Sequence, residues 1–468
     1  MAATVLAGLL LSVLLIATSN TGPALVNDTR AAALASWSLG TQGELALPEP
    51  WPASANYWGV TTPDGRVHVN RFPGVALWAT PAYAVAHLAA GSPDPPAHPF
   101  LVDLRPAGWS AALTVVAVAV AALALLRRVV PSWWAAGAAL VVTLGTGMWS
   151  VAADALWPHG PAALGLVALL LGWRRLHEAA ADVAGAVGDV ASRVAGGVEG
   201  TTVDGVARQA AGGGAVLAGI GATTAVLVRP HLAVATVVIG AWVLIRERAA
   251  RRAGVAAMAG TAVGLALLSL YSWRVFGVWT PTAGYDVGGH LGGLVTHSPW
   301  QTLRSFGAAF IGLERGLLVW SPVVAVALVA ACWQRRRVPP WTVVAAIAGL
   351  AYLLVQVRAV GHFGGAHFFG PRISLEALVL ATPLLATGVW HAGTAAAASG
   401  RVSRAAAVAV LVIAAVGSVG WHAFGAVARS TSPEQVARWE EIDRTVHRDF
   451  GDLDLGDVDL RSPGRTRG

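Results

Sequence analysis

Asp28 is the first residue of the chain whose type and position suit chemistry. It lies in the segment Asn20–Arg30, soon after the first apolar run and at the start of a long polar stretch. A carboxylate placed there can take a proton from a substrate hydroxyl as a general base. The alternative is a helix cap, because Asp-Thr-Arg before an Ala-rich stretch is favourable capping chemistry. The two roles are compatible.

A second carboxylate, Asp154, lies five residues before His159 in a short segment between two apolar runs. A carboxylate and an imidazole at this spacing could hold a phosphate-linked cation or orient a substrate hydroxyl. We therefore take Asp154 as a second catalytic candidate and His159 as a substrate-binding candidate. The alternative is a plain polar turn.

Three arginines stand where apolar runs begin or end. Arg229 precedes Pro230 and His231 in the middle of a long apolar stretch, while Arg315 and Arg372 each precede a later run. A guanidinium grips a phosphate through two parallel hydrogen bonds, so these arginines, with His231, are candidate ligands of an anion. Each could instead anchor a helix at the membrane interface.

The remaining candidates lie in segments that connect the later apolar runs. Tyr285 belongs to a long polar segment and is a further substrate-binding candidate. Glu376 follows Arg372 by four residues and is expected to pair with it. His362 and His367 flank a Gly-Gly pair and are the candidate ligands for a divalent cation, the only cofactor that the pattern suggests. The sequence does not establish a metal site.

The elements that must position these residues are membrane helices. Only 12% of the residues are charged and 55% are hydrophobic, against roughly 25% charged residues in a soluble protein. Apolar runs of near-membrane length recur from end to end, so we expect an all-α, polytopic transmembrane bundle. The sequence has no lysine, and its richness in Ala, Gly and Val is typical of a GC-rich genome such as an actinobacterial one. A single cysteine excludes an intramolecular disulfide and a cysteine-based metal site.

The arginines set the topology. Positive charge marks the inner loops of membrane proteins, and five arginine clusters agree on one threading with the N-terminus inside. The net charge of +7 therefore needs no nucleic-acid partner. About eleven spans follow, at residues 2–19, 108–126, 131–151, 160–173, 213–228, 231–245, 253–272, 316–333, 341–357, 373–391 and 405–424.

This threading divides the chain into a membrane domain, residues 1–427, and a polar tail, residues 428–468, which we expect outside and partly disordered. The first outer loop, residues 20–107, contains Asp28. Its apolar stretch 74–90 cannot be a span without inverting every later loop, so we expect a re-entrant or interfacial helix. On the inner side, residues 176–212 should form a surface helix and a flexible linker.

The layout resembles the GT-C superfamily of integral-membrane glycosyltransferases. The resemblance rests on the first-loop Asp28, about eleven spans, the Arg229-Pro230 break, and the segments 314–322 and 364–372, and it covers residues 1 to about 425. It is nearest to protein mannosyltransferases, the aminoarabinose transferase of lipid A, and actinobacterial arabinosyl- and mannosyltransferases. Many members carry an acidic pair where this chain has Asn27 and Asp28.

The resemblance implies inverting transfer of a mannose- or arabinose-type sugar from a polyprenyl-phosphate donor to a glycan, lipid or protein acceptor. The reaction would take place at the outer face of the cell membrane, with Asp28 as the base and Asp154 as the second acidic residue. The donor's lipid tail would lie in a groove between spans, near the loop after Tyr271. Two alternatives stay open, a transporter or flippase for a lipid-linked sugar or other anion, and a non-catalytic protein of envelope assembly.

Overall fold

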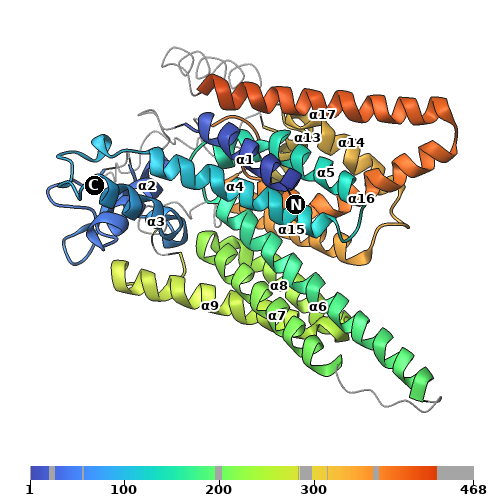
Figure 1. The fold of residues 1–468 in the computed structure, drawn as a ribbon. Helices are drawn as coiled ribbons and strands as arrows, with labels where there is room; N and C mark the ends of the chain where they lie inside the picture. Colours follow the sequence, from blue (N-terminus) through green and yellow to red (C-terminus); the bar gives the residue numbers. More distant parts are fainter. Residues whose placement is uncertain are drawn as a thin grey trace.

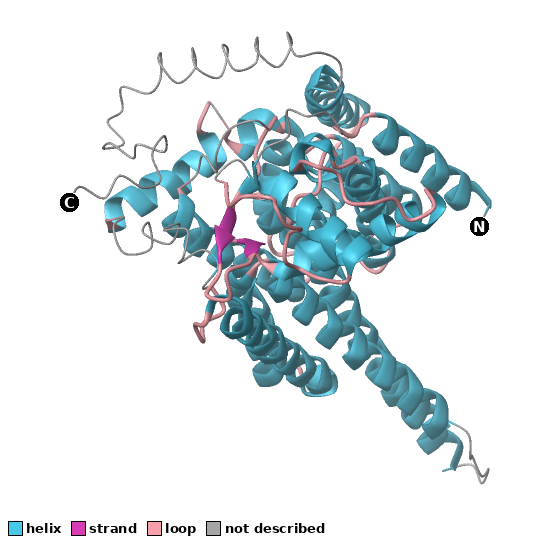
Figure 2. Ribbon diagram, turned by 90° about the vertical axis from the view of Figure 1, so that its left-hand side faces the viewer, coloured by secondary structure: helices cyan, strands magenta, loops and turns pink. Residues whose placement is uncertain are grey.

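The computed structural model describes residues 2–20, 27–54, 57–194, 203–282, 284, 298–313, 315–361 and 368–429. Helices make up nearly all of this part of the chain. The prediction of an all-α fold misses one small element, an antiparallel hairpin of β1 (Gly59–Thr61) and β2 (Val67–Val69), which lies among the helices in Figure 2. The predicted external tail falls almost wholly outside the described residues.

The helices follow one another along the chain with short connections. They are α1 (Ala2–Ala17), α2 (Asn27–Gln42), α3 (Pro73–Ala89), α4 (Arg105–Leu126), α5 (Ser132–Leu144), α6 (His159–Val194), α7 (Val203–Val228), α8 (Ala233–Arg246), α9 (Arg251–Phe276), α12 (Pro299–Ile311), α13 (Leu317–Trp320), α14 (Pro322–Trp333), α15 (Pro340–Val360), α16 (Leu375–Ala398) and α17 (Arg401–Arg429). Short helical turns are η2 (Pro99–Leu101), η3 (Met148–Ala153), η4 (Pro230–Leu232) and η5 (Arg248–Ala250).

Five helices of the described chain are long and apolar enough to cross a membrane: α4, α9 together with η5, α15, α16 and α17. Shorter apolar helices lie within α1, α5, α7, α8 and α14. Only 11% of the most apolar window of α17 is buried, so most of its surface is left for lipid. The prediction of a helical, multi-pass membrane protein is thereby confirmed. The number of eleven spans and their orientation stay predictions.

The structure corrects four predicted boundaries, although helix occupies part of every predicted span. The predicted span 316–333 is divided at Ser321 between α13 and α14, and α7 begins at Val203, inside the predicted linker. Helix α6 does not stop near residue 173 but continues unbroken to Val194, through the segment expected to be a separate surface helix. The predicted span 131–151 is divided, because α5 ends at Leu144 and the chain resumes with the wide turn η3. Pro158 and Gly145 border these breaks, and neither residue favours a continuous helix.

One end of the bundle carries a small lobe, the α2–α3 lobe, formed by the described residues between 27 and 104 (Figure 1). Helix α3 confirms that residues 74–90 are helical. It packs against α2, where a Cβ on Gly40 would lie 2.7 Å from the carbonyl oxygen of Thr80. The start of α3 reaches α7, since a Cβ on Gly74 would lie 2.5 Å from the carbonyl oxygen of Leu227. The lobe is therefore joined to the membrane helices by close backbone contact.

Helices α6 and α7 pack more closely than ordinary side chains would allow. A Cβ on Gly172 would lie 2.5 Å from backbone atoms of α7, and a Cβ on Gly221 would lie 2.5 Å from backbone atoms of α6. Helix α9 approaches the other side of α7 in the same way at Gly260. Small residues at helix interfaces are the usual means of association in membranes. The group α6–α7–α9 lies side by side in Figure 1.

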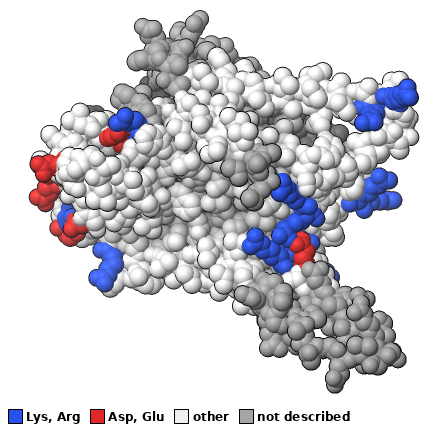
Figure 3. All heavy atoms as spheres, in the orientation of Figure 1, with Lys and Arg blue, Asp and Glu red and all other residues white. Residues whose placement is uncertain are grey.

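Charge is unevenly distributed along the bundle. On the face shown in Figure 3, most arginines lie at the end away from the α2–α3 lobe, and most acidic residues lie over the lobe. The middle of this face carries almost no charge. This is the pattern of a protein whose two ends lie in water and whose middle lies in lipid.

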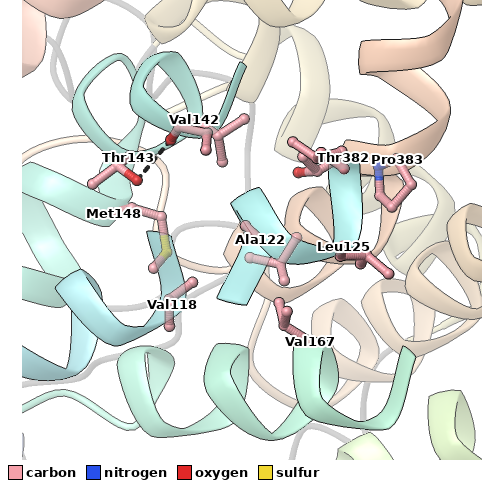
Figure 4. Close-up of a pocket in the computed structure, with 12 residues that line it drawn as sticks. Val118, Ala122, Leu125, Val142, Thr143, Met148, Val167, Thr382 and Pro383 are labelled. Carbon is pink, nitrogen blue, oxygen red and sulfur yellow. Dashed lines mark hydrogen bonds between the residues drawn. The ribbon is translucent and has the colours of Figure 1, made fainter. Parts of the chain in front are cut away.

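A closed cavity of about 20 Å³ lies between α4, α5, α6 and α16, lined by Val118, Leu125, Thr143 and Pro383 among others (Figure 4). It has room for about one water molecule. The hydroxyl of Thr143 donates to its own helix at 2.8 Å, and so leaves little polarity in the wall. This cavity belongs to the packing of the membrane core.

Candidate functional site

Asp28 meets two arginines that are distant in sequence. Arg71 donates to Oδ1 of Asp28 from Nε at 3.0 Å and from Nη2 at 2.5 Å. Arg372 donates to Oδ2 from Nη1 at 3.3 Å. Both carboxylate oxygens are thus engaged, and one negative charge faces two positive ones. A cluster with an excess of positive charge is suited to bind an anion.

Local sequence explains where the three side chains lie. Helix α2 begins at Asn27, so Asp28 lies in its first turn, where the helix dipole favours a negative charge. Arg71 lies in the short connection between the end of β2 at Val69 and the start of α3 at Pro73. Arg372 follows Gly370, whose φ of 102° lies in a region that only glycine adopts easily. Asp28 can therefore support the helix end and still pair with the arginines.

An aromatic ring lies against each of the two arginines. The guanidinium of Arg71 lies 4.4 Å from the ring centre of Trp58, and that of Arg372 lies 4.3 Å from the ring centre of Trp157. Such contacts attract a cation without neutralising it. Trp58 has a φ of 52°, which is strained for a bulky residue and is a feature that clusters at functional sites.

The electrostatics of Asp28 follow from these contacts. Burial raises the pKa of the Asp28 carboxyl, but the charges of Arg71 and Arg372 and their hydrogen bonds outweigh burial. The net effect is a pKa well below the usual range of an aspartate. The carboxylate is therefore ionised at neutral pH and is a weak base for as long as it stays between the two arginines.

Arg315 extends the cationic region. It is buried, and its guanidinium lies 4.0 Å from the ring centre of Phe368. The same ring lies 4.8 Å from the guanidinium of Arg372. Two of the three predicted anion-binding arginines therefore lie close together around one aromatic ring, next to Asp28.

Arg229 lies in a different, fully buried cluster. Its Nη1 donates to Oε1 of Glu376 at 2.7 Å, and Nδ1 of His159 lies 2.9 Å from each of these two atoms. The hydroxyl of Tyr352 donates to the second oxygen of Glu376 at 3.2 Å. The expected pairing of Glu376 with Arg372 is therefore wrong, because Glu376 pairs with Arg229.

This second cluster joins four segments, namely the start of α6, the break between α7 and η4, α15 and the first turn of α16. Both Glu376 and His159 are at most 1% exposed. Trp157 lies between the two clusters, with its ring centre 6.2 Å from that of His159 and 4.3 Å from the guanidinium of Arg372. The buried cluster thus lies directly behind the residues that face Asp28.

The other predicted site residues stand apart from Asp28 or are not described. Asp154 is buried after η3, where its carbonyl oxygen accepts from the backbone N–H of Asn20 at 2.6 Å. His231 lies in η4, beside the buried Arg229. Tyr285, His362 and His367 lie outside the described residues. The predicted divalent-cation site is therefore untested, and within the described chain no three His, Cys, Asp or Glu side chains converge as metal ligands.

Sequence reasoning missed Arg71, Trp58 and Phe368. A weak signal was present for Arg71, because an arginine in an outer loop runs against the positive-inside trend. Phe368 lies in the segment 364–372 that carries the resemblance but was not singled out, and tryptophans such as Trp58 are ordinarily part of the interfacial belt.

Comparison with known protein families and with curated protein sequences finds no match to this chain. The case for a function consequently depends on the geometry around Asp28 and on the membrane setting.

Proposed function

We propose that the protein is an inverting glycosyltransferase of the GT-C type that uses a polyprenyl-phosphate sugar as its donor. The observation that carries the proposal is the cluster of Asp28, Arg71 and Arg372 at one end of a membrane bundle. It combines a carboxylate able to act as a base with two guanidinium groups able to bind a phosphate. Both chemical requirements of such a transfer are met within one hydrogen-bonded group.

In the proposed reaction the acceptor hydroxyl gives its proton to Asp28 and attacks the anomeric carbon of the donor sugar. The bond between that carbon and the phosphate oxygen breaks, and the lipid phosphate leaves with an additional negative charge. Arg372 and Arg71 stabilise this charge, and Arg315 contributes from the far side of Phe368. Attack from the face opposite the leaving group inverts the anomeric carbon.

The membrane setting supports a lipid-linked donor. An open groove of about 490 Å³ lies between α7 and α9, lined by Gly219, Thr223, Ala259 and Gly260 among others. Its lining residue nearest the end of α9 is Val263, roughly 20 Å along the helix from Phe276 at 1.5 Å per residue. This groove is our candidate site for the lipid tail. It replaces the location expected from the sequence, which was a groove near the loop after Tyr271.

The end of α9 lies beside the hairpin that precedes Arg71. Beyond the end of α9, a Cβ on Gly277 would lie 3.9 Å from the side chain of Pro63, in the turn of the β1–β2 hairpin. Arg71 follows that hairpin. A lipid lying in the groove can therefore present its phosphate to Arg71 from the membrane side.

The distribution of charge supports an outer active site. The positive-inside rule favours an orientation with the arginine-rich end of the bundle inside and the α2–α3 lobe, with Asp28, outside. A donor carried by a membrane lipid is available there without a nucleotide.

The test is transfer of labelled sugar by the purified protein in lipid nanodiscs, with mannosyl and arabinosyl polyprenyl phosphates offered separately. Asp28→Asn should lower turnover by about 10²–10⁴-fold, the usual contribution of a general base. Glu44→Gln is the matched control, since it also removes one carboxylate of the lobe that pairs with an arginine.

Unchanged turnover in Asp28→Asn would make Asp28 a structural residue and leave Asp154 as the next candidate. No transfer by the wild type, together with movement of intact lipid-linked sugar across proteoliposomes, would favour the transporter or flippase instead. The sugar and the acceptor are identified by which labelled product forms.

A further inference from the structure

The contacts of Asp28 conflict with its proposed role as a base. A base needs an oxygen lone pair directed at the acceptor hydroxyl, yet Oδ1 accepts twice from Arg71 and Oδ2 accepts from Arg372. The phosphate of the donor needs the same two guanidinium groups. The guanidinium groups of Arg71 and Arg372 would therefore have to bind both the Asp28 carboxylate and the phosphate, although both anions must act in the reaction.

The arginines are the fixed members of this cluster. Arg71 is held at 4.4 Å from the Trp58 ring centre and donates from Nη1 to Oδ1 of Asn70 at 2.7 Å. Arg372 is held by the rings of Trp157 and Phe368, at 4.3 and 4.8 Å. None of these contacts involves Asp28. The guanidinium groups therefore keep their positions if the carboxylate moves.

Asp28 is the movable member. Its side chain is 26% exposed, against 12% and 13% for Arg71 and Arg372. A change of its first side-chain torsion, χ1, swings the carboxylate away from the arginines while α2 stays in place. The first turn of α2 also supplies backbone N–H groups, which favour any anion that takes its place.

We propose that the Asp28 carboxylate occupies the binding site of the donor's phosphate group in the free protein. On binding, the phosphate displaces the carboxylate from Arg71 and Arg372. This inference depends on the proposed function. The exchange is non-covalent and needs no co-reactant. It releases the lone pairs of Asp28 at the moment when the anomeric carbon arrives, so the carboxylate gains basicity only beside a bound donor.

Two consequences follow. The donor binds before the acceptor can be deprotonated, which gives the reaction an obligatory order. Removal of the carboxylate frees both arginines in advance, so a neutral side chain at position 28 strengthens phosphate binding while it abolishes transfer.

The experiment measures binding alone. A C55 polyprenyl phosphate without sugar is titrated against wild type, Asp28→Asn, Asp28→Ser and Glu44→Gln in nanodiscs at about 0.15 M salt, where charges further apart than about 8 Å are screened. Asp28→Asn and Asp28→Ser should bind about tenfold or more tightly than wild type, because hydrogen bonds to charged groups are strong. Glu44→Gln should bind as wild type does.

The serine variant guards against misfolding, since serine also supports a helix start. Inorganic phosphate is titrated in parallel, because the displacement involves only the phosphate group. The same gain should appear for inorganic phosphate, at weaker overall affinity if the lipid tail contributes.

The outcomes separate failure of the displacement from failure of the proposed function. Equal or weaker lipid-phosphate binding by both Asp28 variants would refute the displacement and leave the glycosyltransferase proposal standing. No lipid-phosphate binding by any variant, including wild type, would refute the proposed function and this inference together. A gain of the same size in Glu44→Gln would show a general charge effect, and would also overturn the inference.

Discussion

The guanidinium of Arg372 lies 3.3 Å from the carboxylate of Asp28, although 344 residues separate the two in the sequence. The contact brings the connection before α16 onto the first turn of α2. It links the α2–α3 lobe to the membrane helices through charge as well as through packing. Any substitution at one of these residues therefore changes the electrostatic environment of the other.

Lysine should not replace arginine at the phosphate-binding positions. Arg71→Lys and Arg372→Lys should each weaken binding of polyprenyl phosphate by about tenfold or more, roughly 1.4 kcal/mol, because an ammonium lacks the planar fork. Arg66→Lys, in the exposed pair with Glu44, is the control. Near-normal titration curves for both Arg71→Lys and Arg372→Lys would mean that these arginines only hold helices in register.

The pH dependence of kcat/KM for the donor should show how the neighbouring arginines lower the pKa of Asp28. The pKa of Asp28 is lowered in the free protein, so its carboxylate stays ionised below the usual aspartate value of about 3.9. Arg372→Gln removes a lowering contribution while burial still raises the pKa. Its acidic limb should therefore move to higher pH. Identical acidic limbs for wild type and Arg372→Gln would contradict the assignment.

Glu376→Gln should destabilise the protein strongly. The substitution leaves Arg229 with a neutral partner inside the bundle, and breaking a buried ion pair on one side costs about 3–5 kcal/mol. Asp103→Asn is the comparison, because Asp103 is 50% exposed and pairs with the exposed Arg105 at an expected cost of about 0–1 kcal/mol. Thermal unfolding in nanodiscs measures both. Equal Tm values would show that the Arg229 cluster contributes little to stability.

The groove between α7 and α9 should affect only long-chain donors. Ala259→Phe places a ring in the groove and should raise KM for a C55 donor, with little change for a C10 donor. Ala262→Phe is the matched control, because Ala262 is also exposed on α9 but does not line the groove. An equal effect on both chain lengths would place the lipid tail elsewhere.

The proposed orientation can be tested by cysteine labelling. Cys332 is exposed and is first replaced by serine. Glu44→Cys should then react with a membrane-impermeant thiol reagent in intact cells, and Arg336→Cys should react only after lysis. The reverse pattern would put Asp28 on the inner side and would remove the donor supply that we propose.

Sequence reasoning found two members of the Asp28 cluster and missed the third for a physical reason. Asp28 and Arg372 stand out because each interrupts an apolar pattern at the end of a span. Arg71 lies among many other polar residues of a long loop, and only the return of the β1–β2 hairpin brings it to Asp28. Periodicity predicts helices well, but it does not encode how a loop folds back.

The partner of Glu376 shows that residue spacing does not predict ion pairs between different helices. The four-residue spacing to Arg372 would favour pairing on a helix, but α16 begins only at Leu375, so Arg372 lies on non-helical backbone. The actual partner, Arg229, is 147 residues away and reaches Glu376 because α7 and α16 both pack against α6, which carries His159. Spacing rules hold within an element, whereas pairs between elements depend on the tertiary arrangement.

The Asp28–Arg372 contact can form only late in synthesis, because the ribosome makes the chain from its N-terminus. Asp28 and Arg71 are synthesised early, while Arg372 follows Asp28 by 344 residues. At about 5–20 residues per second, roughly 20 to 70 seconds pass before the second guanidinium exists. During that interval the lobe holds an Asp28 with a single arginine partner. A nascent chain that stops before Arg372 lacks the second guanidinium and cannot complete the cluster.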